Sequence, residues 1–256
     1  MRKIVLMVVL LAGQLLISCS GDDDDPGSDS RIDILPASTM LMEFETFAVN
    51  NGRQESFGNA IRAGGHISSW KKFMDNDLNM PITAYLISTN KDAAYSDEGW
   101  AWDTEFKLEG EQYTSKLLAT ESENGVVWEM LISKPGSFED FTAIQGLSAP
   151  DRKSGTWSLF KHPVDSIEAV KIHWEENAEG IINHMKYTAH RDGSYIEYTI
   201  TDESIYDGLY NLLNNGNTAS VGWNRNKKYG WITEQEYYQD DQRHCWNISF
   251  EDDECE

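Results

Sequence analysis

The chain has 256 residues, a formal net charge of −22 and a hydrophobic content of 40%. So negative a field repels phosphate backbones, which excludes nucleic acid as an expected partner. The length and the hydrophobic content suffice for one domain with a sizeable core.

Residues 1–18 show the three parts of a secretory signal peptide. Arg2 and Lys3 form a basic start, and residues 4–11 are an unbroken apolar run. This run is too short to cross a bilayer, which needs about 20 apolar residues. The alternatives are a short membrane anchor and an ordinary cleaved signal followed by a chance cysteine.

Residues 16–19, Leu-Ile-Ser-Cys, resemble the lipobox of bacterial lipoproteins. The resemblance implies that diacylglycerol is added to the Cys19 thiol, that the bond before Cys19 is cut, and that the new amine is acylated. One acyl chain anchors a protein only marginally, whereas several hold it durably. The resemblance therefore predicts membrane lipid as a partner, through acylated Cys19.

An acidic cluster follows the lipidation site directly. It resembles the export signal that sends Bacteroidota lipoproteins to the outer face of the outer membrane, and it consists of Ser20, Asp22, Asp23, Asp24 and Asp25. A block of like charges also stays extended, so a plain solvated tether is the alternative. We predict a lipidated acidic tether over residues 19–38 and a lipid-anchored, surface-exposed location.

The early part of the domain shows one alternating and one helical pattern. Within residues 39–49, Met40, Met42 and Phe44 alternate with Leu41, Glu43 and Glu45, which predicts a half-buried strand. Residues 57–80 have apolar side chains at helical spacing, although Gly64-Gly65 weakens or breaks such a helix. Pro81 would open a second helix at its first position, and a strand over residues 82–88 is the alternative.

From Gly99 onward the pattern is that of β-strands separated by turns. Asn124-Gly125 predicts a hairpin turn with positive φ at both residues. The predicted strands cover residues 100–108, 113–121, 126–133, 138–145, 155–161, 167–175, 181–190, 195–201, 206–213, 219–224, 229–233 and 245–250.

No run of helices separates these strands, which excludes parallel βαβ packing. About ten consecutive antiparallel strands cannot lie flat and open without curling or closing. We therefore predict a single mainly β domain over residues 39–256, an antiparallel meander that forms a strongly curved sheet or half-barrel around an N-terminal helical segment. A closed up-and-down barrel is the first alternative, and a two-sheet sandwich is the second.

Four short motifs along these strands resemble a family of uncharacterised Bacteroidota outer-membrane lipoproteins. They are residues 128–133, 154–157, 223–225 and 244–246, and the resemblance covers most of the chain after residue 55. It implies the fold and the location. No catalytic residue comes with it, because the family has no established activity.

Cys245 and Cys255 are the two cysteines that remain once Cys19 is acylated. An even pair in an oxidising compartment favours a disulfide, which would hold the C-terminal end. A nucleophilic or metal-binding cysteine would need a partner. His244 is adjacent in sequence, but neighbours along a strand point to opposite faces.

The sequence contains no HExxH, GxSxG, phosphate-loop or CxxC motif. His173 and Glu175 share one face of a predicted strand, as do His184 and Lys186, and we interpret them as solvated residues of an outer face. We therefore expect a protein that is not an enzyme and holds no metal or cofactor.

The tryptophans fall about one per strand. They can fill the concave face of the sheet, as aromatic residues do in cores. They can also line a cavity for an apolar ligand or a sugar ring. The candidate ligand-facing residues are Trp100, Trp102, Trp128, Trp157, Trp174 and Trp223.

Two functions follow from these observations. The first is a non-enzymatic binding or carrier lipoprotein for an apolar or glycan ligand, and an unfilled internal pocket would favour it. The second is a lipid-tethered interaction subunit of an envelope complex, and an exposed apolar patch at the rim of the sheet would favour that.

Overall fold

The computed structural model describes residues 31–47, 58–96, 99–161, 163–164 and 166–255. The chain divides into two compact units, residues 1–31 and 32–256. Of the first unit, the structure describes only residue 31. The predicted signal peptide, Cys19 and the acidic residues 20–25 lie outside the described residues. Among the described helices, none has the length and apolar character needed to cross a membrane.

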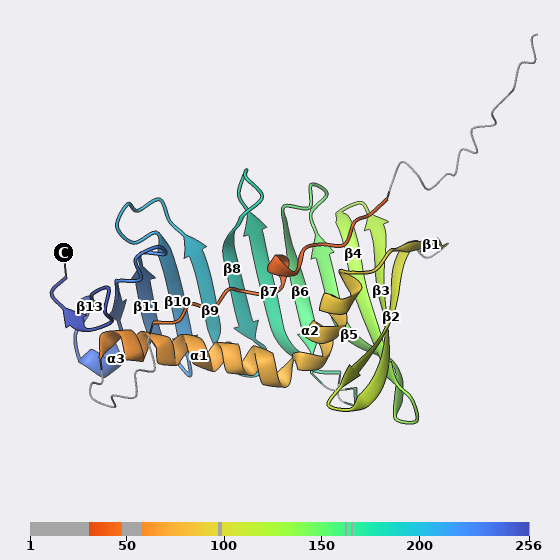
Figure 1. Ribbon diagram of the computed structural model, residues 1–256, viewed down its shortest axis with the longest axis horizontal. Coiled ribbons are helices and arrows are strands. Elements are labelled where there is room, and N and C mark those ends of the chain that lie inside the picture. Colours follow the sequence, from red (N-terminus) through yellow and green to blue (C-terminus); the bar gives the residue numbers. More distant parts are fainter. Residues whose placement is uncertain (1–30, 48–57, 97–98, 162, 165, 256) are drawn as a thin grey trace, which may run out of the picture. The chain divides into compact units, whose positions relative to one another are not determined.

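The second unit is built on one antiparallel sheet whose 14 strands follow one another in chain order (Figure 1). Its first and last strands are free edges, so over the described residues the sheet is an open meander. This confirms the predicted fold class over the barrel and the sandwich. The strands are β1 (Ala94–Ser96), β2 (Gly99–Leu108), β3 (Glu111–Ser122), β4 (Gly125–Lys134), β5 (Phe138–Ser148), β6 (Ser154–Phe160), β7 (Glu168–Glu176), β8 (Ile182–Ala189), β9 (Tyr195–Ile200), β10 (Gly208–Asn214), β11 (Asn217–Trp223), β12 (Gly230–Thr233), β13 (His244–Trp246) and β14 (Asp252–Asp253).

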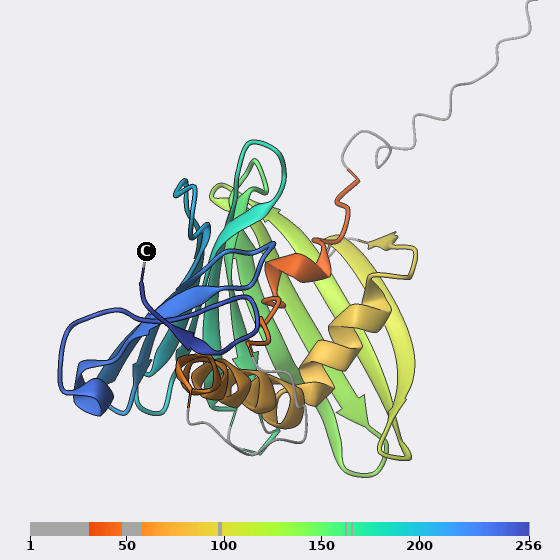
Figure 2. The same cartoon turned by 60° about the vertical axis from the view of Figure 1, so that its left-hand side comes forward.

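Two helices, α1 (Asn59–Asp77) and α2 (Asn79–Ser88), lie across the concave face of this sheet (Figures 1 and 2). The predicted break at Gly64-Gly65 is wrong, because α1 runs through both glycines. The cost of about 1 kcal/mol per interior glycine is offset by burial of one helix face. Pro81 is the third residue of α2 instead of its first, and it is tolerated there because N–H groups of the first turn have no partner within the helix. The alternative strand over residues 82–88 is also wrong.

The predicted strand over residues 39–49 is wrong for the part that the structure describes. Residues 32–47, which we call the strap, contain only a short 3-10 helix, η1 (Ala37–Thr39), and then run extended across the sheet without joining its ladder (Figure 1). Ile32 and Leu35 are buried in the core, so the compact unit begins inside the predicted tether of residues 19–38.

Tyrosine hydroxyls of the sheet take the place of a partner strand for the strap. The Tyr187 hydroxyl donates to the carbonyl of Met40 (2.7 Å) and accepts from the N–H of Met42 (2.5 Å). The Tyr210 hydroxyl does the same for Glu43 (3.0 Å) and Glu45 (3.2 Å). Backbone groups of the strap that would otherwise be buried without a partner are thereby satisfied.

Glycines lie opposite tryptophans across neighbouring strands of the sheet. A Cβ atom added to Gly146 would lie 2.3 Å from the ring of Trp157, so that indole lies directly over the glycine. A glycine inside a strand therefore marks a close approach here instead of a break. The glycine–tryptophan pairs are Gly146 with Trp157, Gly155 with Trp174, Gly208 with Trp223, Gly222 with Trp231 and Gly230 with Trp246.

The predicted turn at Asn124-Gly125 is one residue out of place. Ser122 pairs with Gly125, so the central residues of the turn are 123 and 124, and of the predicted pair only Gly125 has a positive φ. Turns with positive φ at both central residues lie instead at Glu109-Gly110 and Asn215-Gly216.

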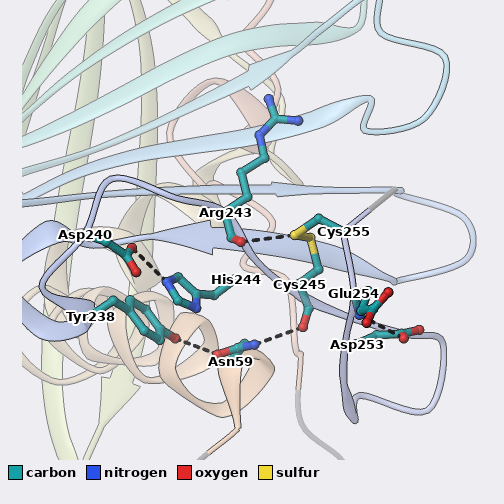
Figure 3. The surroundings of a disulfide bond; sticks show 9 residues. All are labelled: Asn59, Tyr238, Asp240, Arg243, His244, Cys245, Asp253, Glu254 and Cys255. Carbon is teal, nitrogen blue, oxygen red and sulfur yellow. Dashed lines mark hydrogen bonds and ion pairs between the residues drawn. A yellow bond between two sulfur atoms is a disulfide. The ribbon is translucent and has the colours of Figure 1, made fainter.

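At the C-terminal end, a disulfide joins Cys245 of β13 to Cys255 (Figure 3). The predicted strand over residues 245–250 ends at Trp246, and the chain then turns back into β14. His244 stacks on Tyr238 of the short helix α3 (Gln235–Tyr238), with ring centroids 3.6 Å apart, and its Nε2 lies 3.0 Å from Asp240. Since the Cys245 sulfur is bonded to Cys255, it has no thiolate for a metal or a nucleophilic role.

Candidate functional site

The predicted ligand-facing tryptophans are parts of the core. Five of them are at most 2% exposed: Trp102, Trp128, Trp157, Trp174 and Trp223. Trp223 stacks on Tyr210 at 4.5 Å, and the Trp157 indole N–H donates to Thr39 of the strap at 3.2 Å. Trp100 is half-buried, and the centroid of its ring lies 5.0 Å from that of Tyr95. None of the six is among the described residues that line the four most prominent cavities, and packing accounts for these side chains.

A cavity of about 760 Å³ lies elsewhere, between α1 and one end of the sheet. The start of β7, the end of β8, the start of β9 and the end of β10 all meet at that end, because Val170 pairs with Ala189 and Tyr195 with Leu213. The second half of α1 closes the other side. The lining residues are Ser69, Trp70, Phe73, Asp77, Lys161, Ile167, Glu168, Ala169, Ala189, His190, Arg191, Asp192, Ser194, Asn214 and Asn215.

The apolar part of the cavity wall comes from two rings of α1 and from small side chains of the sheet. Trp70 and Phe73 contact each other edge to face, with centroids 5.8 Å apart. Ala169 and Ala189 lie on the sheet side. Alanines at these positions leave room that a larger side chain would occupy, so the cavity results from local residue size on a face that is otherwise filled.

The ionisable groups of the wall form three pairs. Lys161 Nζ lies 3.0 Å from an oxygen of Asp77, and His190 Nδ1 lies 3.7 Å from Glu168. The third pair joins Arg191 and Asp192 at 3.2 Å. The backbone N–H of Ser194 donates to Asp192 and lowers the pKa of that carboxyl. An apolar wall bordered by a few fixed charges is the usual construction of a site for a small molecule.

The hydroxyl groups in the wall serve local structure. Ser69 Oγ donates to the carbonyl of His66 at 2.7 Å, and Ser194 Oγ accepts from the N–H of Asn215 at 3.2 Å. Within the described part of the wall, no serine is hydrogen-bonded to His190. The described wall therefore does not show the contact between a nucleophile and a base that acyl-transfer sites have.

An ion-pair cluster holds α1 against the C-terminal strands. Glu234 is 4% exposed and accepts from Arg62 at 2.7 and 2.5 Å, while His66 Nε2 lies 3.0 Å from it. Burial opposes ionisation of Glu234, but the hydrogen bonds from Arg62 and His66 outweigh it and lower the pKa of the carboxyl. This cluster fixes one end of the helix whose other end closes the cavity.

The sequence did not predict this site. Its residues come from one helix, from the ends of several strands and from the connections between them, which no local pattern joins. The available signal was weak: Trp70 and Phe73 are three apart, and one face of a helix then carries both rings. No family model, curated protein or solved structure matches this chain.

Proposed function

We propose that this protein is a cell-envelope lipoprotein, anchored in the outer membrane through acylated Cys19, that binds a small apolar or glycan ligand without transforming it. The single observation that carries the binding role is the cavity of about 760 Å³ between α1 and the β6–β10 end of the sheet. Its volume falls within the range of about 300–1,000 Å³ that small-molecule sites occupy.

The wall favours an apolar body with a polar end over a bare sugar. Trp70 is only 5% exposed, so it offers little of its ring face for stacking on a sugar. Phe73, Ala169 and Ala189 supply apolar contacts, while charged pairs at Asp77 and Asp192 can orient a polar group. Burying apolar ligand surface contributes about 25 cal/mol per Å².

Binding of 1-anilinonaphthalene-8-sulfonate, followed by fluorescence, tests the proposal. The change Ala189→Trp fills the cavity, because Ala189 is paired with buried Val170 on the concave side. Thr188→Trp is the matched control, since its side chain lies on the opposite face. We expect saturable binding to the native chain and to the control, and loss in Ala189→Trp.

Equal binding to all three proteins would contradict the proposal, as would absence of saturable binding to the native chain. Competition identifies the ligand class. Displacement by an alkyl alcohol supports an apolar ligand, and displacement by a free sugar supports a glycan.

The anchoring part of the proposal has its own test. Replacing Cys19 with Ala should abolish palmitate labelling of the expressed protein. Replacing Asp22, Asp23, Asp24 and Asp25 with Ala should leave it membrane-bound but protected from external protease. Labelling that persists in the Cys19 variant would contradict the lipid anchor, and unchanged protease access would reduce the acidic cluster to a tether.

A second function, a lipid-tethered interaction subunit of an envelope complex, has one observation in its favour. Val164 and Ile167, in the connection from β6 to β7 beside the cavity, are 79% and 56% exposed. Crosslinking from Ile167→Cys in intact cells distinguishes the two functions. One specific protein adduct, together with absent ligand binding, would support the subunit.

A further inference from the structure

The outer face of the sheet carries a histidine–carboxylate cluster that the cavity does not involve. His173 and Glu175 of β7 and His184 of β8 each offer one ligand atom, and these atoms lie within 4.8 Å of one another. The register explains the arrangement: Glu175 pairs with His184 across the strands, and His173 is two residues away on the same face. Side chains opposite each other in an antiparallel pair have Cβ atoms about 4.5–5.5 Å apart.

The ring of His184 is oriented by a carboxylate from the third strand. His184 Nε2 lies 3.0 Å from Glu197 Oε1 of β9. Its Nδ1 is buried, and within the described part of the chain it has no hydrogen-bond partner. In a neutral imidazole one nitrogen donates and the other accepts. If Nε2 donates its proton to Glu197, Nδ1 carries a lone pair that no described donor reaches.

This pairing is the usual environment of a metal-ligating histidine. Such residues donate their second ring N–H to a carboxylate, which fixes the tautomer and the orientation of the ring. Glu175 is suited to the ligand role too. His173 Nε2 lies 2.9 Å from Glu175 Oε1, so these two side chains already face each other on the sheet.

A bulge borders the cluster. The register shifts between Glu175 and Glu176, because Glu176 pairs with Ile182 and Asn183 is left over on β8. Bulges re-aim side chains, and they are over-represented next to functional sites. Here the extra residue lies directly beside His184.

We propose that His173, Glu175 and His184 bind a divalent transition metal ion, Zn²⁺ being the best fit, with Glu197 orienting His184. Two imidazoles and one carboxylate suit zinc, whereas Mg²⁺ and Ca²⁺ prefer oxygen ligands alone. Zinc holds nitrogen and oxygen ligands at about 2.0–2.2 Å, so the three atoms would close to about 3.4 Å of one another by side-chain rotation. The side chains of His173 and Glu175 are 44% and 51% exposed, so water can reach the ion as a fourth ligand.

Zinc titration of the purified full chain tests the site, after removal of metal with a chelator. Excess Mg²⁺ is present to occupy sites made of carboxylates alone. We expect one strong Zn²⁺ site per chain, weakened more than about 100-fold by His173→Ala or His184→Ala. Glu197→Gln should weaken it by about 10-fold, as loss of an orienting partner does.

The matched control is His244→Ala. His244 Nε2 also lies 3.0 Å from a carboxylate, that of Asp240, but His244 is not part of the three-residue cluster. It should leave the strong site unchanged. Circular dichroism checks that each variant is folded. The proposal is overturned if the native chain binds no Zn²⁺ in excess Mg²⁺, or if binding is the same in the His173 and His184 variants. Cavity filling by Ala189→Trp should not change Zn²⁺ affinity.

Discussion

The middle of the concave face and its end beneath α1 are parts of one continuous surface, yet one is filled and the other is hollow. In the middle, the strap lies over the sheet and tryptophans fill the space, with Trp157 hydrogen-bonded to Thr39 and Phe47 against Trp223. At the end of β6–β10, no described residue of the strap lines the cavity. The sheet side of the cavity is lined by Ala169 and Ala189, whereas the middle of the concave face carries tryptophans.

This difference shows how the protein can separate stability from binding on one sheet. Contacts of the strap with the tryptophans stabilise the middle of the concave face. The residues around the cavity have a different requirement, which is to be small enough to leave it open. The cavity then tolerates substitution in a way that the middle does not. The following predictions test that separation, from the largest expected effect to the smallest.

Replacing Trp223 with Ala should destabilise the protein most. The side chain is 1% exposed and contacts both Tyr210 and Phe47. Loss of a large buried aromatic side chain costs about 3–5 kcal/mol. Replacing the half-buried cavity residue Phe73 with Ala should lower the free energy of unfolding by only about 1–2 kcal/mol. Urea unfolding measures both, and equal losses would contradict the separation.

Replacing Glu234 with Gln should lower stability by about 2–3 kcal/mol at neutral pH, less than for a fully buried pair because Arg62 is partly exposed. The pKa of Glu234 is lowered in the folded protein. Its contribution is therefore present above the ordinary glutamate pKa of about 4.3 and is lost as pH falls through the folded value.

The stability difference between the native chain and Glu234→Gln should accordingly shrink between neutral and strongly acidic pH. Urea midpoints measured at several pH values give that difference. A gap that stays constant down to acidic pH would show that the Glu234 charge contributes nothing.

Replacing Gly146 with Ala should cost on the order of 2 kcal/mol, because the new methyl group overpacks the site. The added Cβ would lie 2.3 Å from the Trp157 ring. Gly65→Ala in α1 is the control of opposite sign: nothing lies within 4 Å of its added Cβ, and a helix interior gains up to about 1 kcal/mol from this change. Thermal unfolding compares them, and a stabilised Gly146 variant would refute the close contact.

Replacing Tyr187 with Phe should have the smallest effect, about 1–2 kcal/mol, because backbone groups of Met40 and Met42 lose their partner. Hydrogen exchange at the Met42 amide should quicken. Tyr195→Phe, half-buried and outside the strap contacts, is the control and should leave that amide unchanged. Equal exchange in both variants would show that the hydroxyl does not hold the strap.

The sequence predicted the sheet well because its information is local. Alternation such as that of Trp102, Thr104 and Phe106 marks a strand, and the turns between strands are short. The same rule failed at residues 39–49. Met42 and Phe44 do alternate with Glu43 and Glu45, but tyrosine hydroxyls pair with the backbone of this segment instead of a strand. Periodicity identifies a buried face and does not identify its partner.

The two sites escaped prediction for a different reason. The cavity joins Phe73 to Ala189 across more than a hundred residues, and no pattern within either segment points to the other. His173 and His184 were visible as outer-face residues. Their meeting depends on the register of β7 with β8, which the bulge at Glu175 shifts and which hydropathy cannot specify.

The strictly sequential strand order has a consequence for how the chain reaches this fold. Each strand pairs with its immediate predecessor, so the sheet can form hairpin by hairpin with small loops to close. The strap joins late, because its contact between Met42 and Tyr187 spans 145 residues and closing a longer loop costs more entropy. Until it docks, a row of indoles faces water. We therefore expect the first part of the fold to be synthesised to dock last and to cover indoles of the sheet that could otherwise cause aggregation.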